Sequence, residues 1–328
     1  MPPPPSEMPL LTISSPSTIE KCKHLILFPN DIFICSYPKS GTTWTQHIIL
    51  SLLLRHRQIK EREAYEHENE NEHDVHVPKK LQLPYGHVSD YAPFFEIDPH
   101  WSGEQLIPEI RARHAELGRR IFNTHLRWDM LPSDSNNNEE PTHAKFIYIL
   151  RSPLDVCVSF YHHLSHQVEG CYEHSLTQFF HEWMDGKLPF GSWDDHVCSY
   201  LPAMACEKNV FLLSYEDMVQ DLQGCVEKLV EFLELGDTLN ETDVADLLPS
   251  FTFEHMKKDL DRFQPKSVTW KNDFQFLRKG KIGEHKVELG TDERKAFEQY
   301  LKEKNFSQDV KAVFGTNLDT SNKILNLV

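Results

Sequence analysis

Residues 31–44 read DIFICSYPKSGTTW, and this stretch decides the fold. Its first part, Asp31–Ser36, is a short apolar run of the kind that predicts a buried strand. Apolar residues then recur at helical spacing, at Trp44, Ile48 and Leu52. The stretch therefore predicts a strand that is followed at once by a helix, which is the first unit of an α/β fold.

Three further runs predict strands, at Arg120–Thr124, Lys145–Leu150 and Val210–Ser214. After the second of these, Ser152-Pro-Leu-Asp155 has the pattern of a capping box with proline at the first helical position. After the third, apolar residues repeat at helical spacing through residues 222–233. Strands that alternate with helices predict an α/β fold with a central parallel sheet flanked by helices.

The organisation outside these units is simple. Residues 1–20 are rich in proline and serine and are predicted to form a flexible lead-in, which leaves residues 21–328 as a single domain. Two polar stretches, 61–76 and 133–142, have no apolar residues at regular spacing and are interpreted as solvent-exposed excursions from the domain.

The composition excludes several kinds of protein. The chain has 34 Lys and Arg against 50 Asp and Glu, a net charge of −16, which argues against nucleic acid or an anionic membrane as partner. The seven cysteines form no CxxC pair, as expected for reduced thiols. No secretory signal pattern or apolar run of membrane-spanning length is visible. We therefore expect a soluble cytoplasmic protein, as a monomer or homodimer.

Polar residues follow all four predicted strands. The loop 37–43 follows the first strand, His125 the second, Arg151 the third and Tyr215 the fourth. Ligands of open parallel sheets bind beyond the carboxyl ends of the strands. We therefore expect these four segments to meet at one site.

The loop YPKSGTT has the composition of a phosphate-binding loop. Gly41 allows a tight turn, and the first amides of the following helix are unpaired donors that suit an anion. Lys39 adds a cation, and Thr42 and Thr43 add hydroxyl donors. The loop is not a Walker A motif, because its lysine precedes the glycine.

Five segments together resemble the cytosolic sulfotransferase family: YPKSGTTW at 37–44, PFFE at 93–96, RSPLDVCVSFYH at 151–162, YEDM at 215–218 and FLRKG at 276–280. They occur in the family's order and span most of the chain. The resemblance implies the P-loop-NTPase-like sulfotransferase fold and a donor, 3′-phosphoadenosine-5′-phosphosulfate (PAPS), whose product is 3′-phosphoadenosine 5′-phosphate (PAP). The implied reaction transfers a sulfuryl group to a hydroxyl or amine of a small molecule, and the family needs no metal.

The resemblance also assigns roles to single residues. His125 is the implied general base, Lys39 stabilises the leaving group, and Phe94 lines the acceptor site together with His125. The implied donor-binding residues are Lys39, Ser40, Gly41, Thr42, Thr43, Trp44, Arg151, Ser159, Tyr215, Phe253, Met256, Arg278, Lys279 and Gly280. Imidazole titrates near neutrality, and arginine suits forked contact with phosphate, so these residue types fit their implied roles.

The sequence departs from the family pattern at three places. Asn123 stands where the family has a lysine two residues before the base, so we expect slower turnover unless another cation substitutes. Residues 251–256 match the family only at Phe253 and Met256. Residues 284–303 contain no recognisable dimer motif of the animal members.

Two other functions stay open at this point: a P-loop kinase that uses ATP, and a nucleotide-binding module without catalytic activity. The histidines at 67, 73 and 76 lie in a charged stretch and are interpreted as loop residues rather than metal ligands. The histidines at 162, 163 and 166 are interpreted as helix residues near the mouth of the acceptor site. The identity of the acceptor is beyond the sequence.

Overall fold

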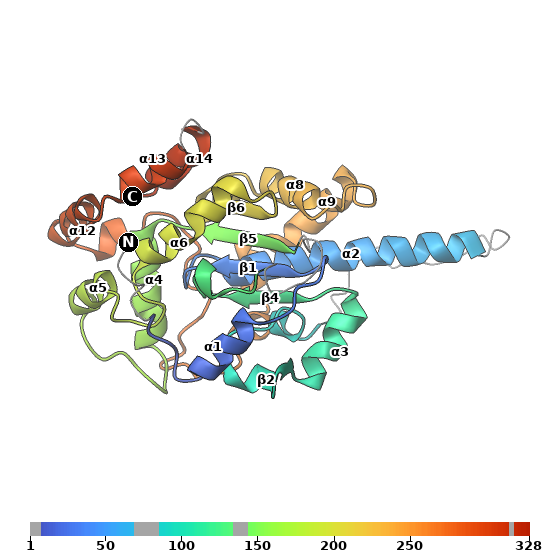
Figure 1. Cartoon of the computed structure of the whole chain (residues 1–328), viewed down its shortest axis with the longest axis horizontal. Helices are drawn as coiled ribbons and strands as arrows, with labels where there is room; N and C mark the ends of the chain where they lie inside the picture. The colour runs from blue at the N-terminus through green and yellow to red at the C-terminus, as the bar shows by residue number, and fades with distance from the viewer. Residues whose placement is uncertain (1–7, 69–84, 134–143, 315–317) are drawn as a thin grey trace.

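The computed structural model describes residues 8–68, 85–133, 144–314 and 318–328, and its centre is a parallel sheet (Figure 1). The four strands lie in the order β4-β1-β5-β6, and every neighbouring pair is parallel. Their bounds are β1 Ile32–Ser36, β4 Ile121–Thr124, β5 Lys145–Leu150 and β6 Val210–Ser214. All four predicted strands are therefore confirmed, and so is the α/β fold class.

Helices cover the sheet (Figure 1). A short antiparallel pair, β2 Trp101–Ser102 and β3 Gln105–Leu106, forms a separate two-stranded sheet. The described α-helices are α1 Pro16–Lys23, α2 Thr42–Glu68, α3 Pro108–Leu117, α4 Pro153–Ser165, α5 Leu176–Met184, α6 Trp193–Cys206, α7 Tyr215–Gln220, α8 Leu222–Phe232, α9 Glu241–Leu247, α10 Phe253–Lys257, α11 His285–Glu288, α12 Thr291–Glu303, α13 Phe306–Phe314 and α14 Leu318–Leu325. The predicted helices after β1, β5 and β6 are present.

Each face of the sheet packs into its own hydrophobic core, which explains the unbroken apolar strands. In β1, Phe33 and Cys35 belong to one buried cluster, whereas Ile32 and Ile34 belong to the other. The Phe33 ring stacks on rings of both neighbouring strands, with centroid distances of 4.9 Å to Phe122 and 5.1 Å to Phe146. These buried pairs hold the strands whose ends carry the site.

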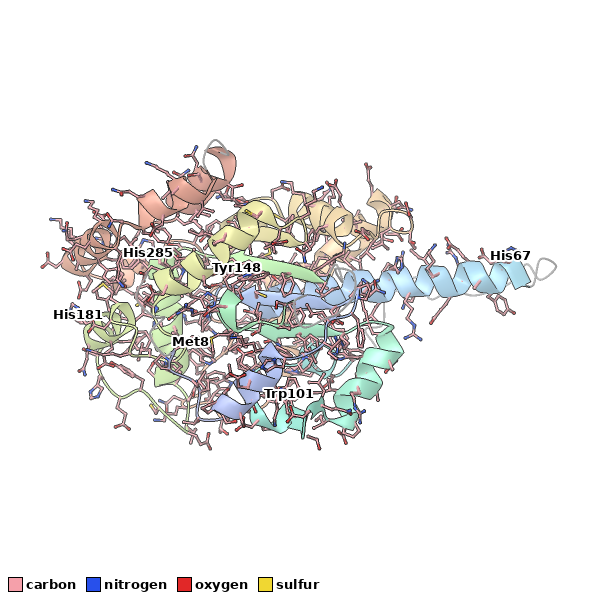
Figure 2. The ribbon with its side chains drawn as sticks, in the orientation of Figure 1. Met8, His67, Trp101, Tyr148, His181 and His285 are labelled. Atoms are coloured by element: carbon pink, nitrogen blue, oxygen red, sulfur yellow. The ribbon has the colours of Figure 1, made fainter. Side chains whose placement is uncertain are left out.

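Helix α2 corrects one prediction, because it continues through residues 61–68 of the stretch interpreted as a solvated excursion. Ion pairs between successive turns support this polar end, for example Arg57–Glu61 at 2.6 Å and Arg62–Glu66 at 3.5 Å. Figure 2 shows His67 at its tip, far from the sheet. The rest of that stretch, and nearly all of 133–142, lie outside the described residues.

The described part of the predicted lead-in packs against the domain. Ser15 caps α1 and also hydrogen-bonds to the Asp98 carboxylate, through its backbone N–H at 2.9 Å and its hydroxyl at 2.8 Å. The Pro9 carbonyl oxygen accepts a hydrogen bond from the Phe190 N–H at 2.7 Å. The division into a lead-in and one domain stays a prediction. No described helix has an apolar stretch long enough to cross a membrane.

Candidate active site

One cavity of about 950 Å³ opens where the carboxyl ends of the strands meet the following helices. It confirms that the four polar segments after the strands come together. The predicted site residues that line it are Lys39, Gly41, Thr42, Thr43, Trp44, Phe94, His125, Arg151, Ser159, Tyr215, Phe253, Met256, Arg278, Lys279 and Gly280. Residues far apart in the sequence therefore form one site.

Ser40 is the predicted site residue that does not line this cavity. Its side chain is 1% exposed, and its hydroxyl has no hydrogen-bond partner among the described residues. The sharp turn that presents Lys39 and Gly41 to the cavity leaves the Ser40 side chain buried. Its predicted contact with the donor could therefore involve only the backbone.

The phosphate loop has an unusual backbone at both residues that flank Ser40. Lys39 has φ of +69° and Gly41 has φ of +109°, and such positive values are costly for residues other than glycine. A Cβ on Gly41 would also lie 2.9 Å from Cδ2 of Tyr215. Helix α2 begins at the next residue, so its unpaired first amides face the loop.

Lys39 reaches into the centre of the cavity. Its Nζ lies 3.3 Å from Nδ1 of His163 and 4.2 Å from the centroid of the Phe276 ring. Burial lowers the pKa of Lys39 to about 7, and the positive charges of Arg151 and Arg278 act in the same direction. The cavity is therefore short of negative charge around this ammonium group.

His125 is held as a neutral imidazole. Its Nδ1 lies 2.8 Å from the Ser36 carbonyl oxygen and donates to it, which leaves Nε2 unprotonated in the neutral ring. Burial lowers the pKa of His125 to about 4, and the charge of Lys39 also lowers it. The rings of Phe94 and Phe190 flank the imidazole, at centroid distances of 5.3 Å and 5.2 Å.

Arg151 is poised for an anion. Its Nη1 donates to the Lys39 carbonyl oxygen at 2.8 Å, and the guanidinium lies 4.3 Å over the Tyr215 ring. Its Nε is buried and has no hydrogen-bond partner among the described residues. A buried donor without a partner is costly, so this nitrogen suits an acceptor that a ligand would bring.

The two other predicted cations are paired with carboxylates. Arg278 contacts Glu284 and lies 3.0 Å from Glu288, and Lys279 lies 3.4 Å from Glu284 and 3.2 Å from Glu288. Burial raises the pKa of Glu288, but hydrogen bonds from His162, Arg278 and Lys279 outweigh it and hold the pKa at about 2. A phosphate at this place has to compete with these carboxylates.

The capping box predicted at the start of α4 is wrong. Ser152 is the N-cap, but its side chain makes no capping hydrogen bond. Asp155 instead accepts hydrogen bonds from the Gly283 N–H at 2.6 Å and from Nδ1 of His285 at 2.7 Å. Donors from the C-terminal segment therefore take this carboxylate, and it ties residues 283–285 to α4.

Asn123 supplies no charge to the site, and one of its two amide N–H groups is already engaged. Its Nδ2 donates to the Ala92 carbonyl oxygen at 2.7 Å, and its side chain is 7% exposed. The cavity therefore has a neutral side chain at the position where the family has a lysine.

Two residues with no role predicted from the sequence, His163 and Phe276, lie beside Lys39. His163 lies on α4 four residues after Ser159, so the helical spacing places both on one face. This four-residue spacing from Ser159 is the feature of the sequence that could have placed His163 at the donor site. No group of three or more metal-ligating side chains is present among the residues that the structure describes.

Comparison with known proteins agrees with this geometry. The sequence matches the family model described as sulfotransferase domain over residues 29–308. Sulfotransferase 2A1 of Macaca fascicularis is 30% identical over 291 residues, which cover 88% of each chain. The amine sulfotransferase of Oryctolagus cuniculus is 26% identical over 311 residues, which cover 93% of this chain and 91% of that protein.

The fold is also similar to solved structures. A mouse sulfotransferase crystallised with PAP has a TM-score of 0.64 at 22% identity, covering 97% of this chain and 95% of that one. Retinol dehydratase, crystallised with retinol and PAP, has a TM-score of 0.61 at 21% identity, covering 88% and 86%. The chain therefore belongs to the sulfotransferase family, and it is a transferase.

Proposed function

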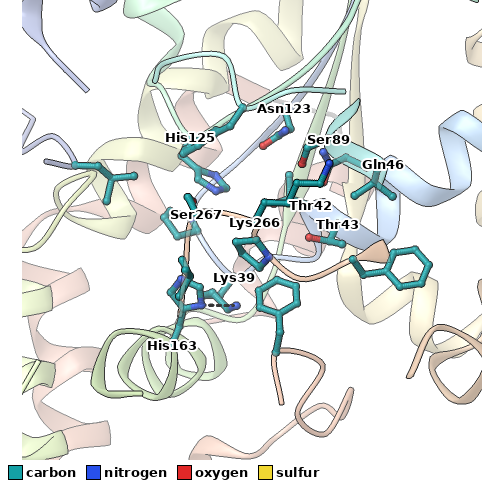
Figure 3. A pocket seen from close by; sticks show the side chains of 18 of the residues that line it. Lys39, Thr42, Thr43, Gln46, Ser89, Asn123, His125, His163, Lys266 and Ser267 are labelled. Carbon is teal, nitrogen blue, oxygen red and sulfur yellow. Dashed lines mark hydrogen bonds between the residues drawn. The ribbon is translucent and has the colours of Figure 1, made fainter. Parts of the chain in front are cut away.

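We propose that this protein transfers a sulfuryl group from PAPS to a hydroxyl or amine of a small molecule, with His125 as general base. The strongest support is that His125 and Lys39 face the same cavity as the phosphate loop (Figure 3). A neutral imidazole can accept the proton of the acceptor, and an ammonium group can stabilise the negative charge that develops on the phosphate leaving group.

The donor site fits a nucleotide with two anionic ends. The phosphate loop and the start of α2 suit the 5′-phosphate. Arg151, whose Nε has no partner among the described residues, and Ser159 suit the 3′-phosphate together with Arg278 and Lys279. Two of the solved relatives were crystallised with PAP, which supports this ligand.

The chemistry follows from the two central side chains. As the acceptor oxygen or nitrogen bonds to sulfur, its proton passes to Nε2 of His125. The bond between sulfur and the bridging oxygen of the 5′-phosphate breaks, and PAP leaves with that oxygen. Lys39 stabilises the negative charge that develops there.

Apolar side chains surround His125 in the cavity, where the Phe94 and Phe190 rings flank the imidazole. Ile97 and residues 10–13 of the predicted lead-in also line the cavity. Retinol dehydratase was crystallised with retinol and, in another structure, with androsterone. We infer an apolar small molecule with one reactive hydroxyl or amine as the acceptor.

The proposed reaction is tested by incubating the protein with ³⁵S-labelled PAPS and a panel of phenols, aliphatic alcohols and amines. Transfer of label to any acceptor, at a rate proportional to enzyme concentration, supports the function. No transfer across the panel, despite tight binding of PAP, would favour the nucleotide-binding module. Stabilisation by ATP but not by PAP in a thermal-shift assay would favour the kinase. Cytoplasmic location and a monomeric or homodimeric state stay predictions.

We expect the affinity for PAP to fall as the pH rises above about 7. The pKa of Lys39 is lowered to about 7 in the ligand-free cavity, and a bound phosphate raises it again. Below pH 7 the lysine is already charged, but above it binding must take up a proton, so the dissociation constant rises by up to about tenfold per pH unit. Titration calorimetry at pH 6 to 9 in buffers of different ionisation enthalpy measures the dissociation constant of PAP and the number of protons taken up on binding. The prediction is wrong if Lys39→Met shows the same proton uptake.

Gly280→Ala is expected to weaken PAP binding by about tenfold, since overpacking costs about 1–3 kcal/mol. Gly280 has φ of +63°, and a Cβ there would lie 2.5 Å from Cδ2 of Phe253. The clash separates two walls of the donor site. Gly118→Ala is the matched control, because it has φ of +76° but no atom within 4 Å of the added Cβ. Equal PAP affinity of the two variants would contradict the prediction.

A further inference from the structure

The ammonium group of Lys39 is held by two uncharged partners. Nδ1 of His163 lies 3.3 Å from Nζ (Figure 3). The centroid of the Phe276 ring lies 4.2 Å from Nζ. Two other cations of the donor site, Arg278 and Lys279, are held by carboxylates instead. No carboxylate of the described residues is recorded in contact with the Lys39 ammonium group, and Nδ1 of His163 is its polar side-chain neighbour.

His163 is itself fixed in place. Its ring meets Trp270 edge to face, with centroids 5.1 Å apart, and lies 6.0 Å from the Phe276 ring. The segment that carries these aromatic residues is tied to the end of α4, because the Lys271 N–H donates to the His166 carbonyl oxygen at 2.7 Å. The imidazole therefore offers Nδ1 to Lys39 from a rigid setting.

We propose that His163 is a positioning residue for Lys39: its Nδ1 accepts a hydrogen bond from the ammonium group and holds this cation beside His125 before the donor binds. The inference rests on the proposed function, because Lys39 matters as the group that stabilises the leaving phosphate. A lysine has three N–H donors, so one hydrogen bond to His163 leaves two for the oxygens of the donor.

The choice of a neutral acceptor has a clear physical reason. The charged and titratable groups that face Lys39 are Arg151, Arg278, His125 and His163, and the first two repel its charge. A carboxylate in place of His163 would compete with the phosphate for the ammonium group, as Glu284 and Glu288 do at Lys279. A purely apolar side chain would leave a buried N–H without an acceptor and favour the neutral amine.

His163 keeps the acceptor form over the working range of pH. Burial lowers its pKa well below the ordinary value for histidine, and the charge of Lys39 lowers it further. With Nδ1 as acceptor, the ring proton resides on Nε2. Ser159 lies one turn earlier on α4, so one helix face carries both a predicted phosphate ligand and the support of Lys39.

The test compares His163→Phe, which removes the acceptor, with His163→Asn, whose amide oxygen can take the place of Nδ1. The titration of Lys39 is followed by NMR of ¹³C-labelled lysine, with Lys39→Met to assign the signal. We expect His163→Phe to lower the midpoint of that titration by about one pH unit and kcat by about tenfold. His163→Asn should restore most of both values. His181→Phe, at an exposed histidine on α5, is the control.

Two results would overturn the proposal. The first is a Lys39 titration that is the same in His163→Phe and in the unaltered protein. The second is an equal loss in His163→Asn and His163→Phe when thermal unfolding shows both to be folded. The NMR readout needs no substrate, so it still decides the role of His163 if the unaltered protein transfers no sulfuryl group and the proposed function fails.

Discussion

His125→Ala is expected to lower the turnover number for sulfuryl transfer by about 10³-fold, because general-base catalysis contributes roughly 10²–10⁴-fold. The hydrogen bond from Nδ1 to the Ser36 carbonyl oxygen, 2.8 Å long, directs the free lone pair of Nε2 to the acceptor. The pKa of about 4 keeps the ring unprotonated at neutral pH. The rate is measured with labelled PAPS at saturating acceptor.

Nucleotide binding separates this role from a structural one. No hydrogen bond joins His125 to a predicted ligand of the 3′-phosphate in the described residues, so the affinity for PAP should change by less than about threefold. His181→Ala, at an exposed histidine, should change neither quantity. An equal loss of turnover and of PAP affinity would contradict the assignment of His125 as base.

Lys39→Met is expected to lower turnover by about 10²–10³-fold, as the loss of one charge-stabilising donor does in other enzymes. Methionine preserves much of the side-chain length but carries no charge. The backbone at residue 39 has φ of +69°, a conformation that costs methionine about as much as lysine, so the comparison isolates the ammonium group. Single-turnover rates at saturating PAPS measure the effect on the transfer step.

A surface substitution provides the control for charge. Lys302→Met removes an exposed lysine of α12, and it should leave turnover unchanged. If Lys39→Met raised only the KM for PAPS and left the transfer step within about twofold, Lys39 would be a binding residue without a catalytic role.

The fold could be predicted because its signals are local. The strands β1 and β5 are unbroken apolar runs, since both faces of the sheet are buried, and each is followed by a helix. The end of α2 was missed because ion pairs one turn apart, such as Arg57–Glu61, support it without an apolar stripe. The prediction that Asp155 takes part in a capping box was wrong, because Gly283 and His285, 128 and 130 residues away, donate to its carboxylate instead.

The resemblance predicted residues that, apart from Ser40, line one cavity, but it did not predict how their side chains pair. The resemblance named Arg278 and Lys279, yet nothing local showed that Glu288 would hold both. His163 was predicted as a helix residue near the acceptor site, but its contact with Lys39 could not be predicted because it spans 124 positions. Such contacts depend on how the segment after residue 264 folds over α4, and this is a property of the tertiary structure.

The affinity for PAP relative to 5′-adenylate tests the central claim most directly. The two ligands differ only in the 3′-phosphate, for which Arg151 offers a buried Nε that has no partner among the described residues. Charge-assisted hydrogen bonds are worth about 1.5–3 kcal/mol each, so titration calorimetry should show PAP to bind at least about 100-fold more tightly. Equal dissociation constants for the two nucleotides would contradict the account.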